Sequence, residues 1–451
     1  MIEVSEAVAS VLREASPFEP QAFPLSDALG LVLAENIHAD TDSPPFDKSL
    51  VDGFAIRLAD CVTLDSLEPR PSGSGVFKDV LPLADGRGSL RSQPLPVIEI
   101  VSAGQMPKRV LDQRAAIQIM TGAPLPVGAE VVVPVEHTVS STAAAVGESA
   151  PGLASSATLL EQTLVSVPIK VASWKPGTNI LRQGASTKRG DLVVAAGSEL
   201  RPQELGALAE WGRALVLARR RPRVAVLATG DELVPIAQTP GPGQIRNSNE
   251  AMLCAQIRRA GADPIPLGIA RDERSHLRER IELGLQADLL VLSGGVSMGD
   301  KDLVPSELAA AGVRQVFHKV NVKPGKPVWF GVHDTSPKSR TLVFGLPGNP
   351  VSSLVCFELF VRIALRQLMG FSTAEPTAVG ACLTQPHTTK GERPTYQPAR
   401  LEWRADGPSV TAIPWVGSSD LRATVSANAM ALFPIGDRTY EPGSRIEVIA
   451  W

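Results

Sequence analysis

Three segments of the chain combine glycines with polar side chains directly after apolar runs. They are residues 229–232 (TGDE), 293–302 (SGGVSMGDKD) and 345–353 (GLPGNPVSS). Glycines let the backbone approach a ligand closely, and N–H groups at a helix start offer partial positive charge to an oxyanion. The sterics of a tight turn explain any one of these loops equally well, but three loops at one sheet edge favour an anion site. Its candidate residues are Gly294, Gly295, Ser297, Gly348 and Asn349.

Acidic residues in the same loops indicate a bound cation. Glu232, Asp300 and Asp302 repel phosphate, but their oxygens suit a hard divalent cation that bridges phosphate oxygens. We therefore expect Mg²⁺. The alternatives are a turn or helix-start carboxylate for Glu232 and an N-cap for Asp302.

A fourth segment, residues 323–327 (KPGKP), carries two ammonium groups on a short loop stiffened by proline. Because proline reduces the freedom of the loop, Lys323 and Lys326 can face one oxyanion at a small entropic cost. The alternative is a solvated pair of charges.

Charge and motif content exclude several other classes of protein. The chain has 44 basic and 47 acidic side chains, which does not favour a general binder of nucleic acid or anionic membranes. Four scattered cysteines and the absence of a Walker A loop argue against a thiolate zinc site and a P-loop enzyme. The most apolar helix candidate, 351–369, contains Glu358, Arg362 and Arg366, so we expect no membrane span. No export signal is evident at the start, and we expect a cytoplasmic protein.

Regular apolar runs in the second half of the chain predict the elements that position these loops. Helix-length amphipathic stretches alternate with these runs, and this alternation is typical of a parallel α/β sandwich, in which ligands gather at the carboxyl ends of the strands. The predicted strands are 224–227, 264–269, 288–292, 313–316 and 341–344. The predicted helices are 249–260, 273–285, 303–311 and 350–369.

The rest of the chain indicates further domains, as expected for 451 residues. Helical spacing predicts helices at 4–12 and 26–33. Short apolar runs between turns predict a small β domain after residue 60 and another from 378 to the end. The first of these β domains has predicted strands at 96–101, 115–120 and 131–135, and residues 65–96 and 140–157 are interpreted as mobile loops without chemistry.

Six segments, in this order, resemble the molybdopterin molybdenumtransferase family, which includes bacterial MoeA and a domain of gephyrin. The segments are 46–55 (FDKSLVDGFA), 119–124 (IMTGAP), 229–233 (TGDEL), 293–297 (SGGVS), 323–327 (KPGKP) and 346–350 (LPGNP). The resemblance implies four domains: an elongated domain from 1–51 and 171–219, an inserted β domain at 52–170, an α/β molybdopterin-binding domain at 220–370, and a β domain at 375–451.

The family resemblance implies an activity and assigns roles to residues. The activity is insertion of molybdenum from molybdate into adenylylated molybdopterin, with Mg²⁺-dependent release of AMP. The catalytic carboxylates would be Asp52, Glu232 and Asp302, and the metal ligands Asp52, Asp300 and Asp302. Further substrate-binding residues would be Thr121, Ser186, Lys323, Lys326, Ser352, Arg393 and Ser418.

The resemblance also implies assembly. A homodimer is expected, with Asp52 and Thr121 of one subunit serving the α/β loops of the other, and molybdopterin adenylyltransferase is a candidate partner. Ser186 departs from the family, which commonly has Asp there, and Arg393 is one residue away from the usual Gly-Arg pair. Two alternatives therefore stay open: a non-catalytic molybdopterin-binding or scaffold paralogue, and a molybdopterin adenylyltransferase, which is a single α/β domain.

Overall fold

The computed structural model describes residues 1–60, 94–142, 163–166, 174–296, 303–336 and 339–451. The chain forms two compact units, one made of residues 1–37 and 194–451 and the other of 38–193.

The unit at 38–193 is built on a six-stranded sheet with the order β8-β5-β7-β6-β10-β9. Its strands are β5 (Gly53–Ile56), β6 (Leu95–Val101), β7 (Ala116–Ile119), β8 (Val131–Pro134), β9 (Val139–Thr142) and β10 (Thr163–Ser166). The three strands predicted before residue 136 are thereby confirmed. The interpretation of 65–96 and 140–157 as loops is wrong at their edges, where β6 and β9 lie, and the remaining residues of both segments lie outside the described part of the chain.

The larger unit begins with helix α1 (Val4–Glu14), which confirms the first predicted helix. The second, at 26–33, is wrong. Residues Leu25–Asp27 form one 3₁₀ turn, Gly30 has φ +75°, and β2 (Val32–Leu33) joins a sheet with the order β1-β13-β2. Val32 and Leu33 point to opposite faces of this short strand and are both fully buried, so packing covers it on both sides. The other elements here are β1 (Gln21–Pro24), α3 (Pro202–Glu210) and β13 (Leu215–Arg219).

The α/β part has one sheet with the order β17-β14-β18-β21-β20-β19. Its strands are β14 (Arg223–Thr229), β17 (Asp263–Ala270), β18 (Leu289–Ser293), β19 (Arg314–His318), β20 (Trp329–Ser336) and β21 (Ser339–Leu346). The first four strands in the sheet order are parallel, but β20 runs antiparallel to both neighbours. The predicted parallel α/β sandwich is therefore confirmed, and the antiparallel strand β20 at this edge is an element that was not predicted from the sequence.

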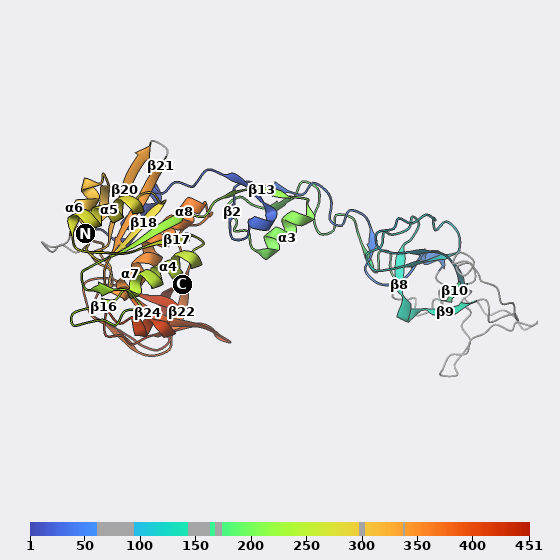
Figure 1. Cartoon of the computed structure of the whole chain (residues 1–451). Helices are drawn as coiled ribbons and strands as arrows, with labels where there is room; N and C mark the ends of the chain where they lie inside the picture. The colour runs from blue at the N-terminus through green and yellow to red at the C-terminus, as the bar shows by residue number, and fades with distance from the viewer. Residues whose placement is uncertain (61–93, 143–162, 167–173, 297–302, 337–338) are drawn as a thin grey trace, which may run out of the picture. The chain divides into compact units, whose positions relative to one another are not determined.

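Helices cover both faces of this sheet (Figure 1). Alternate residues of β14 point to opposite faces: Val226 packs in the core beneath α4, α7 and α8, and Leu227 in the core beneath α5 and α6. The helices are α4 (Ser248–Arg259), α5 (Arg274–Gly284), α6 (Val304–Ala310), α7 (Pro350–Cys356) and α8 (Arg362–Met369). A π-helical turn, Phe357–Val361, interrupts the helix predicted at 350–369.

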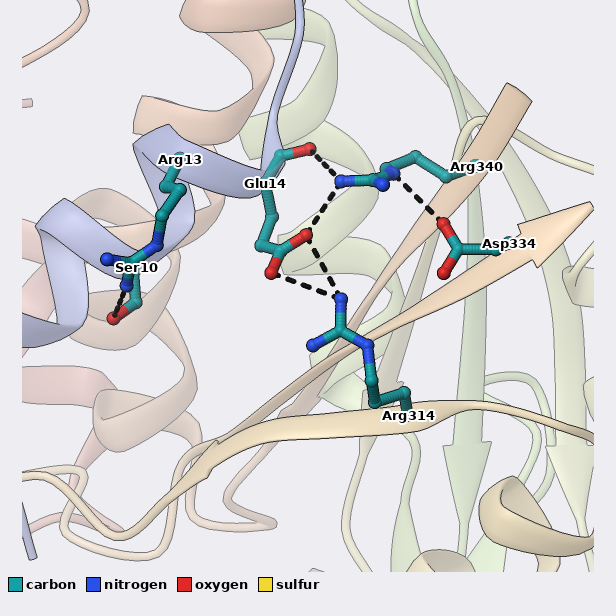
Figure 2. Close-up of polar contacts among 6 residues, drawn as sticks. All are labelled: Ser10, Arg13, Glu14, Arg314, Asp334 and Arg340. Carbon is teal, nitrogen blue, oxygen red and sulfur yellow. Dashed lines mark hydrogen bonds and ion pairs between the residues drawn. The ribbon is translucent and has the colours of Figure 1, made fainter. Parts of the chain in front are cut away.

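Helix α1 belongs to the first of these two cores, where Ala7 and Val11 are fully buried. Its last residue, Glu14, accepts hydrogen bonds from Arg314 at 3.1 Å and Arg340 at 2.7 Å, which fixes the helix end to strands β19 and β21 (Figure 2).

The C-terminal residues form a closed barrel with the order β22-β25-β24-β26-β28, which confirms the predicted β domain. The barrel strands are β22 (Ala378–Leu383), β24 (Thr395–Arg404), β25 (Gly407–Ala412), β26 (Ala429–Phe433) and β28 (Arg445–Ala450). Among the described residues, no helix is both long enough and apolar enough to cross a membrane.

Candidate functional site

A cavity of about 600 Å³ opens at the carboxyl ends of β14, β18 and β21, the edge at which the sequence places its three glycine loops. Each loop contributes to the wall. The lining residues are Thr229, Glu232, Leu233, Ile245, Arg246, Asn247, Ser248, Asn249, Ser293, Gly348, Asn349, Pro350, Ser419 and Leu421.

Glycines allow the loop after β18 to approach the end of β14 closely. Gly294 and Gly295 have φ +98° and +64°, and a Cβ at Gly294 would lie only 2.6 Å from the carbonyl oxygen of Thr229. A Cβ at Gly348 would lie 3.7 Å from the Cα of Gly294. Any side chain at Gly294 would therefore displace the end of β14.

Asn249, at the start of α4, joins two of the loops. Its Nδ2 donates to the hydroxyl oxygen of Ser293 at 2.7 Å and to the carbonyl oxygen of Gly348 at 2.8 Å. Asn247, which is 6% exposed, caps α4 by accepting a hydrogen bond from the backbone N–H of Glu250. Asn249 was not predicted as a site residue, because nothing local in the sequence shows that it joins loops that lie 44 and 99 residues away.

Two buried polar atoms among the cavity residues have no hydrogen-bond partner within the described part of the chain. They are the hydroxyl oxygen of Thr229 and Oδ1 of Asn249. Buried polar groups are normally paired, so these atoms are available to a ligand.

Glu232 lies in the cavity wall and is exposed, in a turn after Gly230. No helix starts there. Instead β15 (Leu233–Val234) pairs with β16 (Ile245–Arg246), and α4 begins only at Ser248, so the helix-start interpretation of Glu232 is wrong.

Three predicted residues of the glycine loop at 293–302 lie outside the described residues: Ser297, Asp300 and Asp302. In the described ranges, no three His, Cys, Asp or Glu side chains form a cluster that could hold a metal. The cavity lining includes Glu232 together with Thr229 and Ser293, so the wall offers one carboxylate and neutral hydroxyl oxygens. This donor set fits Mg²⁺, which uses one or two protein carboxylates together with substrate phosphates.

Arg246 is a second cavity residue that the sequence analysis did not identify. Its Nε donates to the carbonyl oxygens of Ile236 and Gln238, both at 3.1 Å, which holds the guanidinium group at the wall. The group supplies positive charge suited to an anionic ligand.

The start of α7 is connected to the C-terminal barrel. Asn349 donates through Nδ2 to the hydroxyl oxygen of Ser418 at 3.0 Å, and the backbone N–H of Val351 donates to the carbonyl oxygen of Ser418 at the same distance. Ser352, one residue further, is 4% exposed. The structure thus brings Ser418 to the α7 loop, although the two lie far apart in the sequence.

The segment 323–327, here called the lysine loop, packs against α7 and the barrel. Arg393 donates through Nη1 to the carbonyl oxygen of Val322 at 2.8 Å, so Arg393 lies beside the loop. Gly325 has φ +114°, and a Cβ there would lie 2.3 Å from the sulfur of Cys356 on α7. Lys323 lines a separate cavity of about 350 Å³ on the barrel side, whereas Lys326 is exposed.

Asp52 and Thr121 form a contact within the unit at 38–193. The Asp52 carboxylate accepts from the backbone N–H of Thr121 at 2.6 Å and from its hydroxyl at 2.8 Å. Both bonds lower the pKa of Asp52, and the bond from the backbone N–H makes the larger contribution. The lowered pKa keeps the carboxylate ionised. Ser186, in the same unit, is exposed, and its backbone N–H donates to Ser43.

Comparisons with known families and proteins agree with this arrangement. Residues 2–212 match the MoeA N-terminal region (domain I and II), 225–367 a probable molybdopterin binding domain, and 381–451 the MoeA C-terminal region (domain IV). The fold and the cavity thus define a multidomain protein built around a molybdopterin-binding α/β domain.

Relatives and solved structures match over almost the whole chain. Molybdopterin molybdenumtransferases of Staphylococcus epidermidis and Bacillus subtilis are each 30% identical over 99% of this chain, covering 95% and 94% of their own lengths. The molybdopterin biosynthesis MoeA protein of Pyrococcus horikoshii OT3 has a TM-score of 0.73 at 25% identity, with 100% of both chains covered. The chain belongs to the molybdopterin molybdenumtransferase family of enzymes, which confirms the resemblance predicted from the sequence.

Proposed function

We propose that the chain inserts molybdenum from molybdate into adenylylated molybdopterin, with Mg²⁺-dependent release of AMP. The observation that carries the proposal is the cavity at the ends of β14, β18 and β21, which combines backbone approach at glycines with one carboxylate and one arginine. Its volume of about 600 Å³ lies in the range of sites for small organic ligands.

The cavity residues are proposed to bind the pyrophosphate and pterin of the substrate. Arg246 offers charge to phosphoryl oxygens, while the side chains of Thr229 and Asn249 offer hydrogen-bonding atoms that lack partners within the described chain. Gly294, Gly295 and Gly348 let the substrate approach the backbone closely. These interactions orient the phosphoanhydride before it is cleaved.

The lysine loop is proposed to bind molybdate, with Ser352, Arg393 and Ser418 contributing. The lysines supply positive charge to a tetrahedral dianion. Support comes from the contact of Arg393 with the carbonyl oxygen of Val322 and from the packing of Gly325 against α7, the helix that carries Ser352.

Glu232 is proposed to hold Mg²⁺, with Asp300 and Asp302 as further ligands; when bound, the ion stabilises the charge that develops on phosphoryl oxygens. Asp52 is proposed to act as a carboxylate in the same reaction, as metal ligand or proton acceptor. Its lowered pKa supports the role of metal ligand, which requires the ionised form, and makes the carboxylate a weaker proton acceptor. Thr121 holds the Asp52 carboxylate, and Ser186 is proposed as a neutral substrate contact.

Incubation of the purified chain with adenylylated molybdopterin, Mg²⁺ and molybdate tests the proposal. We expect release of AMP and appearance of molybdenum bound to molybdopterin, both abolished by EDTA. Binding of the substrate without AMP release would favour the non-catalytic paralogue instead.

Assembly, location and domain division remain predictions. A homodimer should sediment at about twice 47.7 kDa. We further propose a cytoplasmic location, molybdopterin adenylyltransferase as a transient partner, and the four-domain division at 1–51 with 171–219, 52–170, 220–370 and 375–451. Separate expression of 220–370 and 375–451 tests the last two boundaries, since each piece should fold cooperatively.

A further inference from the structure

The first residues of the chain lie along the backbone that leads into the lysine loop. Ile2 forms a parallel bridge with Val320. Its N–H donates to the carbonyl oxygen of Lys319 at 3.2 Å, and its carbonyl oxygen accepts from the N–H of Asn321 at 2.7 Å. The backbone at 319–322 is therefore paired with the N-terminal residues on one side.

The side chains of Glu3 and Asn321 reinforce this pairing. Nδ2 of Asn321 donates to Oε1 of Glu3 at 2.9 Å. Asn321 is 8% exposed, so loss of this acceptor would leave a nearly buried amide group without its partner.

The opposite side of the same short segment carries the loop itself. The N–H of Val320 donates to the carbonyl oxygen of Lys326 at 3.0 Å, and the N–H of Lys319 donates to that of Val328 at the same distance. Val320 thus lies between Ile2 and Lys326. Backbone hydrogen bonds on the two sides of this segment thus connect the N-terminal residues with Lys326.

Helix α1 anchors these N-terminal residues at a distance from the loop. Its buried face, which includes Ala7 and Val11, packs in the α/β core, and Glu14 binds Arg314 and Arg340 at its other end (Figure 2). Arg314 is the first residue of β19, the strand that runs toward the lysine loop. Helix α1 is therefore fixed at both ends, by the backbone pairing of Ile2 and by the ion pairs of Glu14.

We propose that Glu3 and Asn321 are positioning residues, which hold the backbone of the lysine loop so that Lys323 and Lys326 can converge on one tetrahedral oxyanion. The inference rests on the proposed function of the loop. Two ammonium groups repel each other when no anion lies between them, so their convergence requires a backbone that does not relax apart. Preorganisation of this kind raises affinity without adding contacts.

Three variants of the full chain separate this role from a general effect on folding. Glu3→Ala removes the acceptor, Glu3→Gln keeps an acceptor oxygen without the charge, and Glu6→Ala is the control, an exposed acid in the first turn of α1.

Hydrogen exchange measured on the peptide 319–328 tests the contact directly. In Glu3→Ala we expect exchange there to be about tenfold faster, because a hydrogen bond that holds the N-terminal residues against this segment is lost. Glu3→Gln and Glu6→Ala should retain wild-type protection. Unchanged protection in Glu3→Ala would overturn the proposed clamp.

Equilibrium dialysis with molybdate alone tests the positioning role. Glu3→Ala and Asn321→Ala should bind molybdate about five- to tenfold more weakly than wild type, with Glu3→Gln close to wild type. Equal molybdate affinity in all variants, or no molybdate binding by the wild type, would overturn the inference. If the wild type binds molybdate with this dependence but releases no AMP, the proposed reaction fails and the positioning role stands.

Discussion

The α/β cavity and the Asp52 contact hold their polar groups in different ways. In the cavity, Asn249 connects Ser293 and Gly348, which lie 44 and 99 residues away, and the strands beneath are buried on both faces. The Asp52 carboxylate accepts two hydrogen bonds, both from Thr121, near the surface. Cavity residues are thus coupled to the core, whereas in the described part of the chain the Asp52 side chain is hydrogen-bonded to one neighbour.

This difference separates stability from chemistry. Substitution in the cavity should change ligand binding and unfolding together, because the same hydrogen bonds serve both. Substitution of Asp52 should change the reaction while leaving the fold intact. Four predictions follow this contrast, beginning with the largest effect.

Asp52→Asn should slow AMP release by about 100-fold or more, since the amide neither binds a cation well nor accepts a proton. The thermal unfolding midpoint should fall only slightly, because the side-chain oxygen of Asn can still accept hydrogen bonds from Thr121 near the surface. AMP release in single-turnover experiments measures the effect, and Asp112→Asn, at an exposed acid of the same unit, is the control. Wild-type turnover in a folded Asp52→Asn protein would remove Asp52 from the site.

Lys326→Ala should raise the molybdate concentration that gives half-maximal insertion by about tenfold, because one charge-assisted contact is lost. Lys323→Ala should act in the same direction. Stability should change little for Lys326, whose side chain is exposed. Titration of molybdate at saturating pterin substrate measures both variants, and an unaltered dependence in both contradicts the assignment.

Asn249→Ala should show the coupling expected of the cavity. Loss of two hydrogen bonds should lower the free energy of unfolding by about 1–2 kcal/mol and weaken binding of adenylylated molybdopterin several-fold. Urea denaturation and substrate titration measure the two effects. A change in unfolding free energy without a change in substrate affinity, or the reverse, would contradict the proposed coupling between the cavity and the core.

Thr121→Val should produce the smallest effect, a rise in the pKa of Asp52 toward its ordinary value. The backbone N–H, the larger cause of the lowered pKa, remains, so part of the lowering should persist. A lowered carboxyl pKa contributes stability above the pKa of the unfolded chain and loses it as pH falls through the folded value. Thr121→Val should bring the folded pKa of Asp52 closer to the unfolded one, which narrows the pH range between the two values. Thr121→Ser should restore the wild-type pKa, and NMR titration of the Asp52 carboxyl group distinguishes the two variants.

Periodicity in the sequence predicts most of the α/β elements because buried strands and amphipathic helices carry strong local patterns. Periodicity fails where contacts with distant parts of the chain determine the secondary structure. The segment 26–33 has helical spacing, yet Val32 and Leu33 gain more by pairing beside β13. Strand β20 was missed because it follows a proline-rich loop.

Site prediction divides in the same way. The glycine loops were recognisable because parallel strands must open at one edge. Asn249 and Arg246 were not, because their importance depends on backbone carbonyl groups of remote or irregular segments. Likewise, nothing local in the sequence connects Glu3 with Asn321, which is 318 residues away.

The packing of Gly325 against Cys356 has a practical consequence. Cys356 is completely buried, burial raises the pKa of its thiol, and its sulfur donates to the carbonyl oxygen of Gly325 at 3.6 Å. Alkylation of this sulfur requires local opening of the packing around it, which includes the contact of the lysine loop with α7. Slower alkylation of Cys356 with added molybdate would therefore report occupancy of the loop at a native cysteine, with no engineered residue.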